Sequence, residues 1–168
     1  MFYRICWHIG NFLLRYFYRW KVEGVDNLPS EGGVVIVSNH ANFFDPVIVG
    51  CCFHRKVHFM AKLELFRVPI LNRVIMALGA FPVKRGVADK AAFEASFRFL
   101  ESGQVVGLFP EGTRFMDGRL HPLRPGVAAL AVKGNSVVLP MIIRNSSLIK
   151  FMRFPKVYVH IGKAFRIP

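Results

Sequence analysis

Residues 33–49 change from a strand pattern to a helix pattern across a short polar segment. The run Gly33–Val37 is apolar and rich in β-branched residues, which is typical of a buried strand. Beyond the polar segment, Asp45 is a favoured helix N-cap, and Pro46 suits the first helical position because no N–H is needed there. The pattern predicts His40 just past the carboxyl end of a strand and Asp45 at the N-cap of a helix. Ligand and catalytic sites of open α/β sheets form at that edge.

His40 and Asp45 are spaced so that their side chains can meet. Four residues separate them, and a tight turn would fold the carboxylate back onto the imidazole. In such a pair the imidazole takes a proton from a hydroxyl, while the carboxylate fixes the tautomer and stabilises the imidazolium that forms. No serine or cysteine is presented as a nucleophile beside the pair. We therefore expect the activated hydroxyl to belong to a substrate.

The same two residues also fit simpler interpretations. Asp45 would then only cap a helix, and His40 would only fill a turn. A metal site is a further alternative, but one His and one Asp supply two ligands where a catalytic zinc site usually takes three from the protein. The other histidines show no His-Glu-x-x-His spacing, and we expect no metal.

A second strand-like run also ends in a polar motif. Residues 104–109 are followed by Pro-Glu-Gly-Thr-Arg at 110–114. Gly112 permits a turn with positive φ or a close approach of the backbone. Arg114 offers a planar fork suited to phosphate, and Glu111 can orient it or contact an acceptor hydroxyl. An ordinary Glu–Arg pair on a surface turn is the alternative.

The rest of the chain continues to alternate strand and helix patterns. Further strands are expected at 56–61, 81–83, 137–143 and 156–161, and helices at 69–78, at 89–101 and after Pro125-Gly126. In the helix 89–101, Phe93, Phe97 and Leu100 share one face, which is more typical of a core face than of an acyl-chain tunnel. We predict a single α/β domain with a largely parallel sheet covered by helices.

Four blocks of the chain resemble, in order, those of the glycerolipid acyltransferases. The first is Asn39-His40 with Asp45, and the others are 79–85 (Gly-Ala-Phe-Pro-Val-Lys-Arg), 109–114 (Phe-Pro-Glu-Gly-Thr-Arg) and 137–140 (Val-Val-Leu-Pro). The resemblance runs from Val22 to the end of the chain. It is strongest to the bacterial 1-acyl-sn-glycerol-3-phosphate (lysophosphatidic acid) acyltransferases.

The resemblance implies an enzyme that transfers an acyl group from acyl-CoA or acyl carrier protein to the free hydroxyl of lysophosphatidic acid, giving phosphatidic acid in phospholipid biosynthesis. It implies His40 as general base and Asp45 as the carboxylate that orients it. It implies Arg85 and Arg114 on the acceptor phosphate, within a substrate-binding set of Lys84, Arg85, Glu111, Gly112, Thr113 and Arg114. No metal, and no cofactor besides the acyl donor, is implied. The alternatives are the same transfer to another lysolipid, such as a lyso-ornithine lipid, and a non-catalytic membrane-binding module.

Charge and hydropathy favour a membrane surface as a partner. The 23 lysines and arginines outnumber the 10 acidic residues, and 53% of the residues are hydrophobic. Nucleic acid and anionic membrane both attract a basic surface, but no nucleic-acid-binding motif is present and we expect no such partner. A basic and strongly apolar chain suits an anionic phospholipid membrane and acidic acyl donors. Three cysteines form no disulfide framework and no secretory signal is visible, so we expect the cytoplasmic face of the cell membrane.

Residues 1–21 form a separate segment ahead of an acyltransferase domain expected at 22–168. At about 100° per residue, its polar positions fall within an arc of roughly 80°; they are Arg4, His8, Asn11, Arg15 and Arg19. The remaining surface is apolar and largely aromatic, and the arginines make the segment a poor spanning helix. We expect an amphipathic, monotopic helix that lies in one leaflet. A helix docked on the domain core is the alternative.

Overall fold

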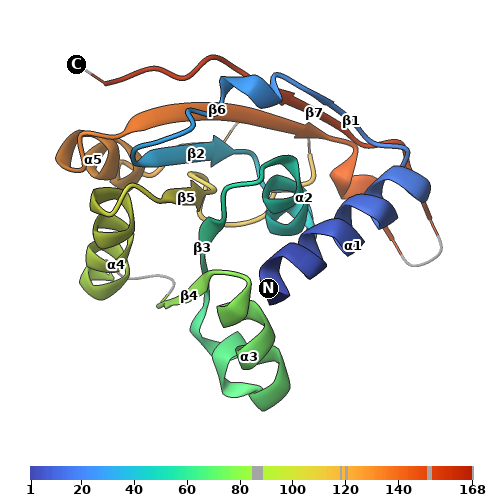
Figure 1. The fold of residues 1–168 in the computed structure, drawn as a ribbon, viewed down its shortest axis with the longest axis horizontal. Helices are drawn as coiled ribbons and strands as arrows, with labels where there is room; N and C mark the ends of the chain where they lie inside the picture. Colours follow the sequence, from blue (N-terminus) through green and yellow to red (C-terminus); the bar gives the residue numbers. More distant parts are fainter. Residues whose placement is uncertain (85–88, 118, 120, 151–152, 168) are drawn as a thin grey trace.

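The computed structural model describes residues 1–84, 89–117, 119, 121–150 and 153–167, and these residues form a sheet of seven strands with five α-helices. The strands are β1 (Lys21–Glu23), β2 (Val34–Ser38), β3 (Val57–Lys62), β4 (Ala80–Val83), β5 (Val105–Leu108), β6 (Val137–Arg144) and β7 (Tyr158–Ile161). The helices are α1 (Phe2–Tyr16), α2 (Asp45–Cys52), α3 (Pro69–Ala77), α4 (Lys90–Glu101) and α5 (Gly126–Lys133). Figure 1 shows their arrangement.

The sheet is mostly parallel, in the order β1-β7-β6-β2-β5-β3-β4. Every neighbouring pair runs parallel except β6 and β7, which are antiparallel. The predicted α/β domain with a largely parallel sheet is therefore confirmed. Strand β1 was not predicted from the sequence, because Lys21–Glu23 is too short to show an apolar pattern, and it is held by parallel pairing with β7.

The central strand β2 is buried on both faces of the sheet. Val34 and Ile36 belong to a core cluster that also takes side chains from α1 and α2. Val35 belongs to the opposite cluster, with Leu100 of α4 and Leu130 of α5. In Figure 1, α4 and α5 accordingly lie together at one end of the sheet, and α1 packs beside α2 toward the other. Because both faces of β2 are covered, its sequence is a continuous apolar run rather than an alternating one.

Helix α1 docks on α2 through one side only. Leu14 is buried, a Cβ at Gly10 would lie 2.6 Å from Cys51 Sγ, and Asn11 Nδ2 donates to the carbonyl of Cys51 at 3.0 Å. Asn11 therefore faces the domain. Its grouping with the polar, outward-facing positions of residues 1–21 is wrong, because the helical pattern does not show the contact with α2. The opposite side of α1 is apolar and exposed, with Phe2, Ile5, Ile9, Phe12, Leu13 and Tyr16.

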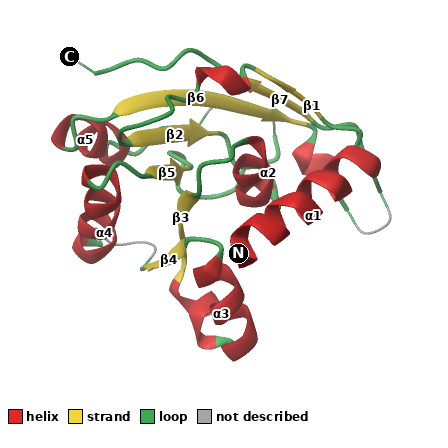
Figure 2. Ribbon diagram, in the orientation of Figure 1, coloured by secondary structure: helices red, strands yellow, loops and turns green. Residues whose placement is uncertain are grey.

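Helix α3 makes the smallest contribution to the core. None of its residues is buried, and it extends away from the sheet (Figure 2). Its contacts are with β4 and with the short 3-10 turn Leu63–Arg67 that precedes it. Across the described ranges, no helix reaches the combination of length and hydropathy required to cross a bilayer.

Gly107 in β5 provides a test of this packing. A Cβ at this position would collide with the ring of Phe59 on β3. We expect Gly107→Ala to lower the free energy of unfolding by about 1–3 kcal/mol, the usual range for overpacking a core. Urea unfolding would measure it. Gly50→Ala is the matched control, because no atom lies within 4 Å of its added Cβ, and it should leave stability unchanged or raise it by about 0.4–1 kcal/mol. Equal stability of the two variants would contradict the packing argument.

Candidate functional site

The turn between β2 and α2 is closed by the side chain of Asp45. Its Oδ2 accepts the N–H groups of Ala41 at 2.6 Å and Asn42 at 2.7 Å, and it lies 2.9 Å from Nδ1 of His40. Helix α2 begins at Asp45 and Phe44 holds the N-cap position, so the prediction that Asp45 is the N-cap is wrong. The carboxylate points back across the turn because two turn N–H groups and the imidazole converge on it there.

The imidazole of His40 has one occupied and one free nitrogen. A carboxylate oxygen only accepts hydrogen bonds, so Nδ1 donates to Asp45 and, in the neutral ring, Nε2 carries the lone pair. Nε2 has no hydrogen-bonding partner among the described residues, while Asp45 is fully buried and His40 is 8% exposed. The predicted contact between the two side chains is present, and the geometry suits a base that accepts a proton from a bound hydroxyl.

Asn39 attaches the end of β2 to β6. Its Nδ2 donates to the carbonyl of Ile143 at 2.9 Å, and its Oδ1 accepts the N–H of Ile143 at 2.8 Å. The carbonyl of His40 also accepts the N–H of Phe115 at 2.9 Å, which joins it to the loop after β5. The backbone on either side of the imidazole is therefore fixed from two directions. The sequence placed Asn39 in a motif but gave no sign of this role.

Aromatic rings hold the imidazole from one face. Phe109, just after β5, stacks on His40 with ring centroids 4.2 Å apart and planes at 19°. Phe59 lies nearly parallel to Phe109 in turn, at 5.9 Å. The stack restricts rotation of the His40 side chain. Gly107 leaves the space that the Phe59 ring fills.

Two cavities meet at His40. The larger, about 550 Å³, is lined among others by Glu111, Arg119 and Arg144. The smaller, about 260 Å³, is lined by Lys84 and Arg124 together with apolar side chains that include Phe93, Val127 and Leu130. His40 and Pro110 are the two residues that line both. Two separate molecules could therefore reach the same imidazole.

The predicted substrate-binding residues divide between these cavities and the surface. Glu111 is buried against the larger cavity, and Gly112, with φ +73°, lines the smaller one beside Arg124. Lys84 lines the smaller cavity. Thr113 and Arg114 are exposed and line neither cavity, so the structure does not bring them to the imidazole. Arg85 lies outside the described residues.

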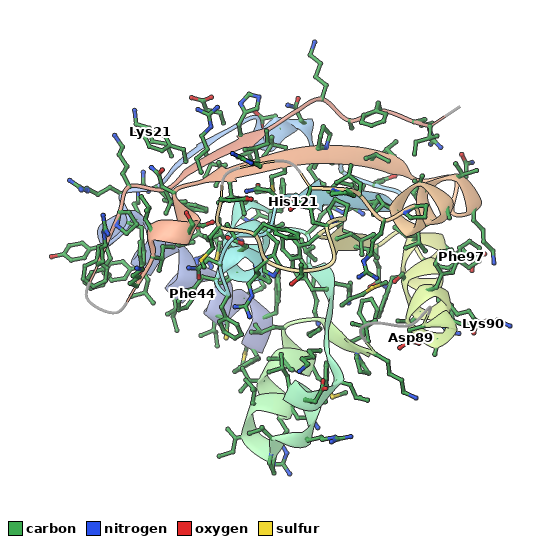
Figure 3. The ribbon with its side chains drawn as sticks, turned by 180° about the vertical axis from the view of Figure 1, so that it is seen from behind. Lys21, Phe44, Asp89, Lys90, Phe97 and His121 are labelled. Atoms are coloured by element: carbon green, nitrogen blue, oxygen red, sulfur yellow. The ribbon has the colours of Figure 1, made fainter. Side chains whose placement is uncertain are left out.

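Lys84 is held at the end of β4 by Asp89. The Asp89 carboxylate accepts the backbone N–H of Lys84 at 2.7 Å and that of Ala92, in the first turn of α4, at 3.1 Å. These backbone hydrogen bonds, the one from Lys84 first, hold the pKa of the Asp89 carboxyl below its ordinary value. Figure 3 shows Asp89 at the start of α4. The contact fixes the strand end that carries Lys84 against the helix that lines the smaller cavity.

Sequence reasoning missed three arginines around the imidazole: Arg119, Arg124 and Arg144. The only sign of them was that no acidic residue follows Asp117. Arg124 is placed at the smaller cavity because its backbone N–H donates to the carbonyl of Pro110 at 2.9 Å. Arg144 is placed at the larger cavity because it is the last residue of β6. Both depend on pairings between distant parts of the chain.

The cysteines take no part in the site. Burial raises the pKa of the Cys51 thiol to about 12 and that of Cys52 well above its ordinary value, so both stay protonated core residues. Within the described part of the chain, no three His, Cys, Asp or Glu side chains are grouped so that they could hold a metal ion.

The tautomer of His40 can be tested directly. In long-range ¹H–¹⁵N spectra of the labelled protein, we expect a protonated Nδ1 and an unprotonated Nε2 for the neutral ring. Asp45→Ala should release the ring to a mixture of both tautomers, because the acceptor is gone. Asp45→Asn is the control, since its amide oxygen can still accept from the turn and from Nδ1. A neutral ring with its proton on Nε2 in the unmodified protein would contradict the geometry.

Comparisons with known proteins show the family of this chain. The family model described as Acyltransferase matches residues 19–144. A 1-acyl-sn-glycerol-3-phosphate acyltransferase of Borreliella burgdorferi is 31% identical over 147 residues, covering 83% of this chain and 59% of the relative. The Bacillus subtilis protein of the same name is 30% identical over 128 residues, covering 76% and 63%. The chain thus spans about six tenths of the length of these two relatives.

A solved structure shares the fold. The crystal structure of the 1-acyl-sn-glycerophosphate (LPA) acyltransferase PlsC from Thermotoga maritima matches with a TM-score of 0.79 at 25% sequence identity. The match covers 98% of this chain and 68% of that one.

Proposed function

Because this chain belongs to the Acyltransferase family, we propose that it transfers an acyl group from an acyl thioester to the free hydroxyl of lysophosphatidic acid, giving phosphatidic acid. The names of its relatives in Borreliella burgdorferi and Bacillus subtilis support this acceptor. The observation that carries the proposal is the His40–Asp45 pair, because its histidine lines two cavities and is held by the carboxylate through Nδ1. An acyl transfer between two bound substrates needs one base that both can reach.

The reaction follows from the arrangement of the pair. Nε2 of His40 removes the proton from the acceptor hydroxyl as its oxygen attacks the thioester carbonyl. Asp45 holds the ring and stabilises the imidazolium that forms. The tetrahedral intermediate then breaks its C–S bond, and the imidazolium returns its proton to the leaving thiolate. The products are the ester and a free thiol, with no covalent enzyme intermediate.

The smaller cavity suits the acceptor. Lys84 and Arg124 supply positive charge for the phosphate, and the side chains of α4 and α5 supply apolar surface for the acyl chain that the acceptor already carries. Gly112 lets the Arg124 guanidinium lie close to the backbone, because a Cβ there would occupy the same space. Thr113 and Arg114, on the surface, and Arg85 stay candidates for phosphate contacts when the acceptor enters.

The base can be tested by substitution. We expect His40→Ala to lower kcat about 100-fold to 10,000-fold, the usual contribution of a positioned general base. The assay is transfer of a labelled acyl group to lysophosphatidic acid in mixed micelles, with acyl-CoA and acyl carrier protein as donors. His160→Ala is the control, because this histidine is exposed and lines neither cavity at His40. Near wild-type turnover by a folded His40→Ala variant would refute the mechanism.

We also propose that α1 lies on an anionic phospholipid surface, at the cytoplasmic face of the cell membrane. Its exposed apolar side points away from the docking contact with α2, and Arg4, Arg15 and Arg19 are exposed beside it. Phe43, Phe44 and Val47, at the start of the neighbouring helix α2, are exposed as well. Apolar and aromatic side chains edged by arginine are the composition of an interfacial helix. The same surface borders the turn that carries His40, so a lipid acceptor has a short route to the base.

Membrane binding can be tested with a matched pair of substitutions. Ile9 on α1 and Val132 on α5 are similarly exposed, at 53% and 55%. Each Glu variant adds the same charge to the protein. We expect Ile9→Glu to weaken binding to vesicles of phosphatidylglycerol and phosphatidylcholine about tenfold or more, because a buried apolar contact with the bilayer is lost. Val132→Glu should change it little. Co-sedimentation would measure both, and equal loss in the two variants would contradict a membrane role for α1.

A further inference from the structure

The larger cavity at His40 contains two cations that the proposed acceptor site does not use, Arg119 and Arg144. Arg144 ends β6 and Arg119 lies in the loop after β5, and both line this cavity, whereas the acceptor phosphate is accounted for by Lys84 and Arg124 in the smaller one. Among the residues that the structure describes, the two cavities share only His40 and Pro110. The larger cavity is therefore a second cationic site that opens on the same base.

The wall of this cavity also offers neutral hydrogen-bonding groups. Beyond Arg144, the chain turns at Asn145, with φ 67°, into the 3-10 turn Ser146–Leu148, and Asn145, Ser146 and Ser147 all line the cavity. Ser146 is 1% exposed, and within the described ranges its hydroxyl has no hydrogen-bonding partner. This oxygen has almost no accessible surface, so it lies behind the wall and does not face the cavity. The Asn145 amide N–H donates to the carbonyl of Lys156 at 2.9 Å. The Asn145 amide oxygen and the Ser147 hydroxyl are the neutral groups that this segment offers to a ligand.

We propose that the larger cavity binds the phosphopantetheine arm of the acyl donor, with Arg144 and Arg119 on its phosphate. This inference rests on the proposed function. A phosphopantetheine thioester carries a phosphate at one end, two amides along its length and the thioester at the other end. The phosphate matches the two arginines, the amides match the side chains of Asn145 and Ser147, and the thioester lies at the end of the cavity that His40 lines. An acceptor in the smaller cavity and a donor in the larger one would then meet at Nε2.

The arm is common to acyl-CoA and to acyl carrier protein, so the cavity serves either donor. In the reaction, the arm's sulfur leaves as the thiolate and takes its proton from the imidazolium of His40. The site therefore has to hold the sulfur near the imidazole without holding the acceptor. Separate walls for the two substrates meet this requirement.

The test is the steady-state kinetics of Arg144→Ala. We expect the KM for acyl-CoA to rise about 10-fold to 100-fold, as for loss of a hydrogen bond to a charged group, while the KM for lysophosphatidic acid stays unchanged. With S-acyl-pantetheine, which lacks the phosphate, wild type and variant should have the same KM. Arg98→Ala is the control, because Arg98 is exposed on α4 and lines neither cavity.

Three results would overturn the assignment: a raised KM for lysophosphatidic acid in place of the donor, a penalty that persists with S-acyl-pantetheine, or a penalty with acyl-CoA but none with acyl carrier protein. An equal penalty with both phosphorylated donors would support it. If wild type gives no product, the proposed function fails. Binding of an S-alkyl phosphopantetheine thioether then tests separately whether the larger cavity holds the phosphopantetheine arm. Tighter binding by wild type than by Arg144→Ala supports the assignment, and equal binding overturns it.

Discussion

One oxygen atom, Oδ2 of Asp45, receives two backbone N–H groups and the imidazole of His40, and the turn from β2 to α2 takes its shape from these three contacts. The carboxylate is fully buried, so water cannot replace any of them. Moving the oxygen would leave two N–H groups without partners and would also free the imidazole. The start of the helix, the path of the turn and the orientation of the imidazole therefore depend on the same atom.

The surroundings of His40 reinforce this arrangement from outside the turn. Asn39 fastens the chain to β6, Phe115 fastens it to the loop after β5, and the ring of Phe109 covers one face of the imidazole. A base that is already oriented needs little rearrangement when a substrate arrives, which is the general advantage of preorganised sites. Selection between substrates then depends on the residues that line the two cavities. The cations among them come from segments outside the turn between β2 and α2.

The parts that could be predicted from the sequence are those that neighbouring residues determine. The apolar run at 33–37 predicts a buried strand, and the spacing of His40 and Asp45 predicts their contact. Helix-capping propensity places Asp45 at the N-cap, because it describes the start of the helix and not the turn that precedes it. In the structure the carboxylate binds the N–H groups of that turn. Arg124 and Arg144 line the cavities at His40 through the backbone hydrogen bond to Pro110 and the pairing of β6 with β2, and Asn11 turns inward because α2 is there. Such long-range packing leaves no local pattern.

Helix α1 rests on α2, and α2 begins at the carboxylate that holds His40. The contact is close, since Gly10 has no room for a side chain against Cys51 and the amide of Asn11 spans the gap. The surface that we assign to the bilayer and the proton acceptor therefore belong to one rigid unit. On the proposed membrane contact, the fold sets the height of the imidazole above the lipid headgroups, so the proposed transfer would select hydroxyls by their depth in the leaflet as well as by their chemistry.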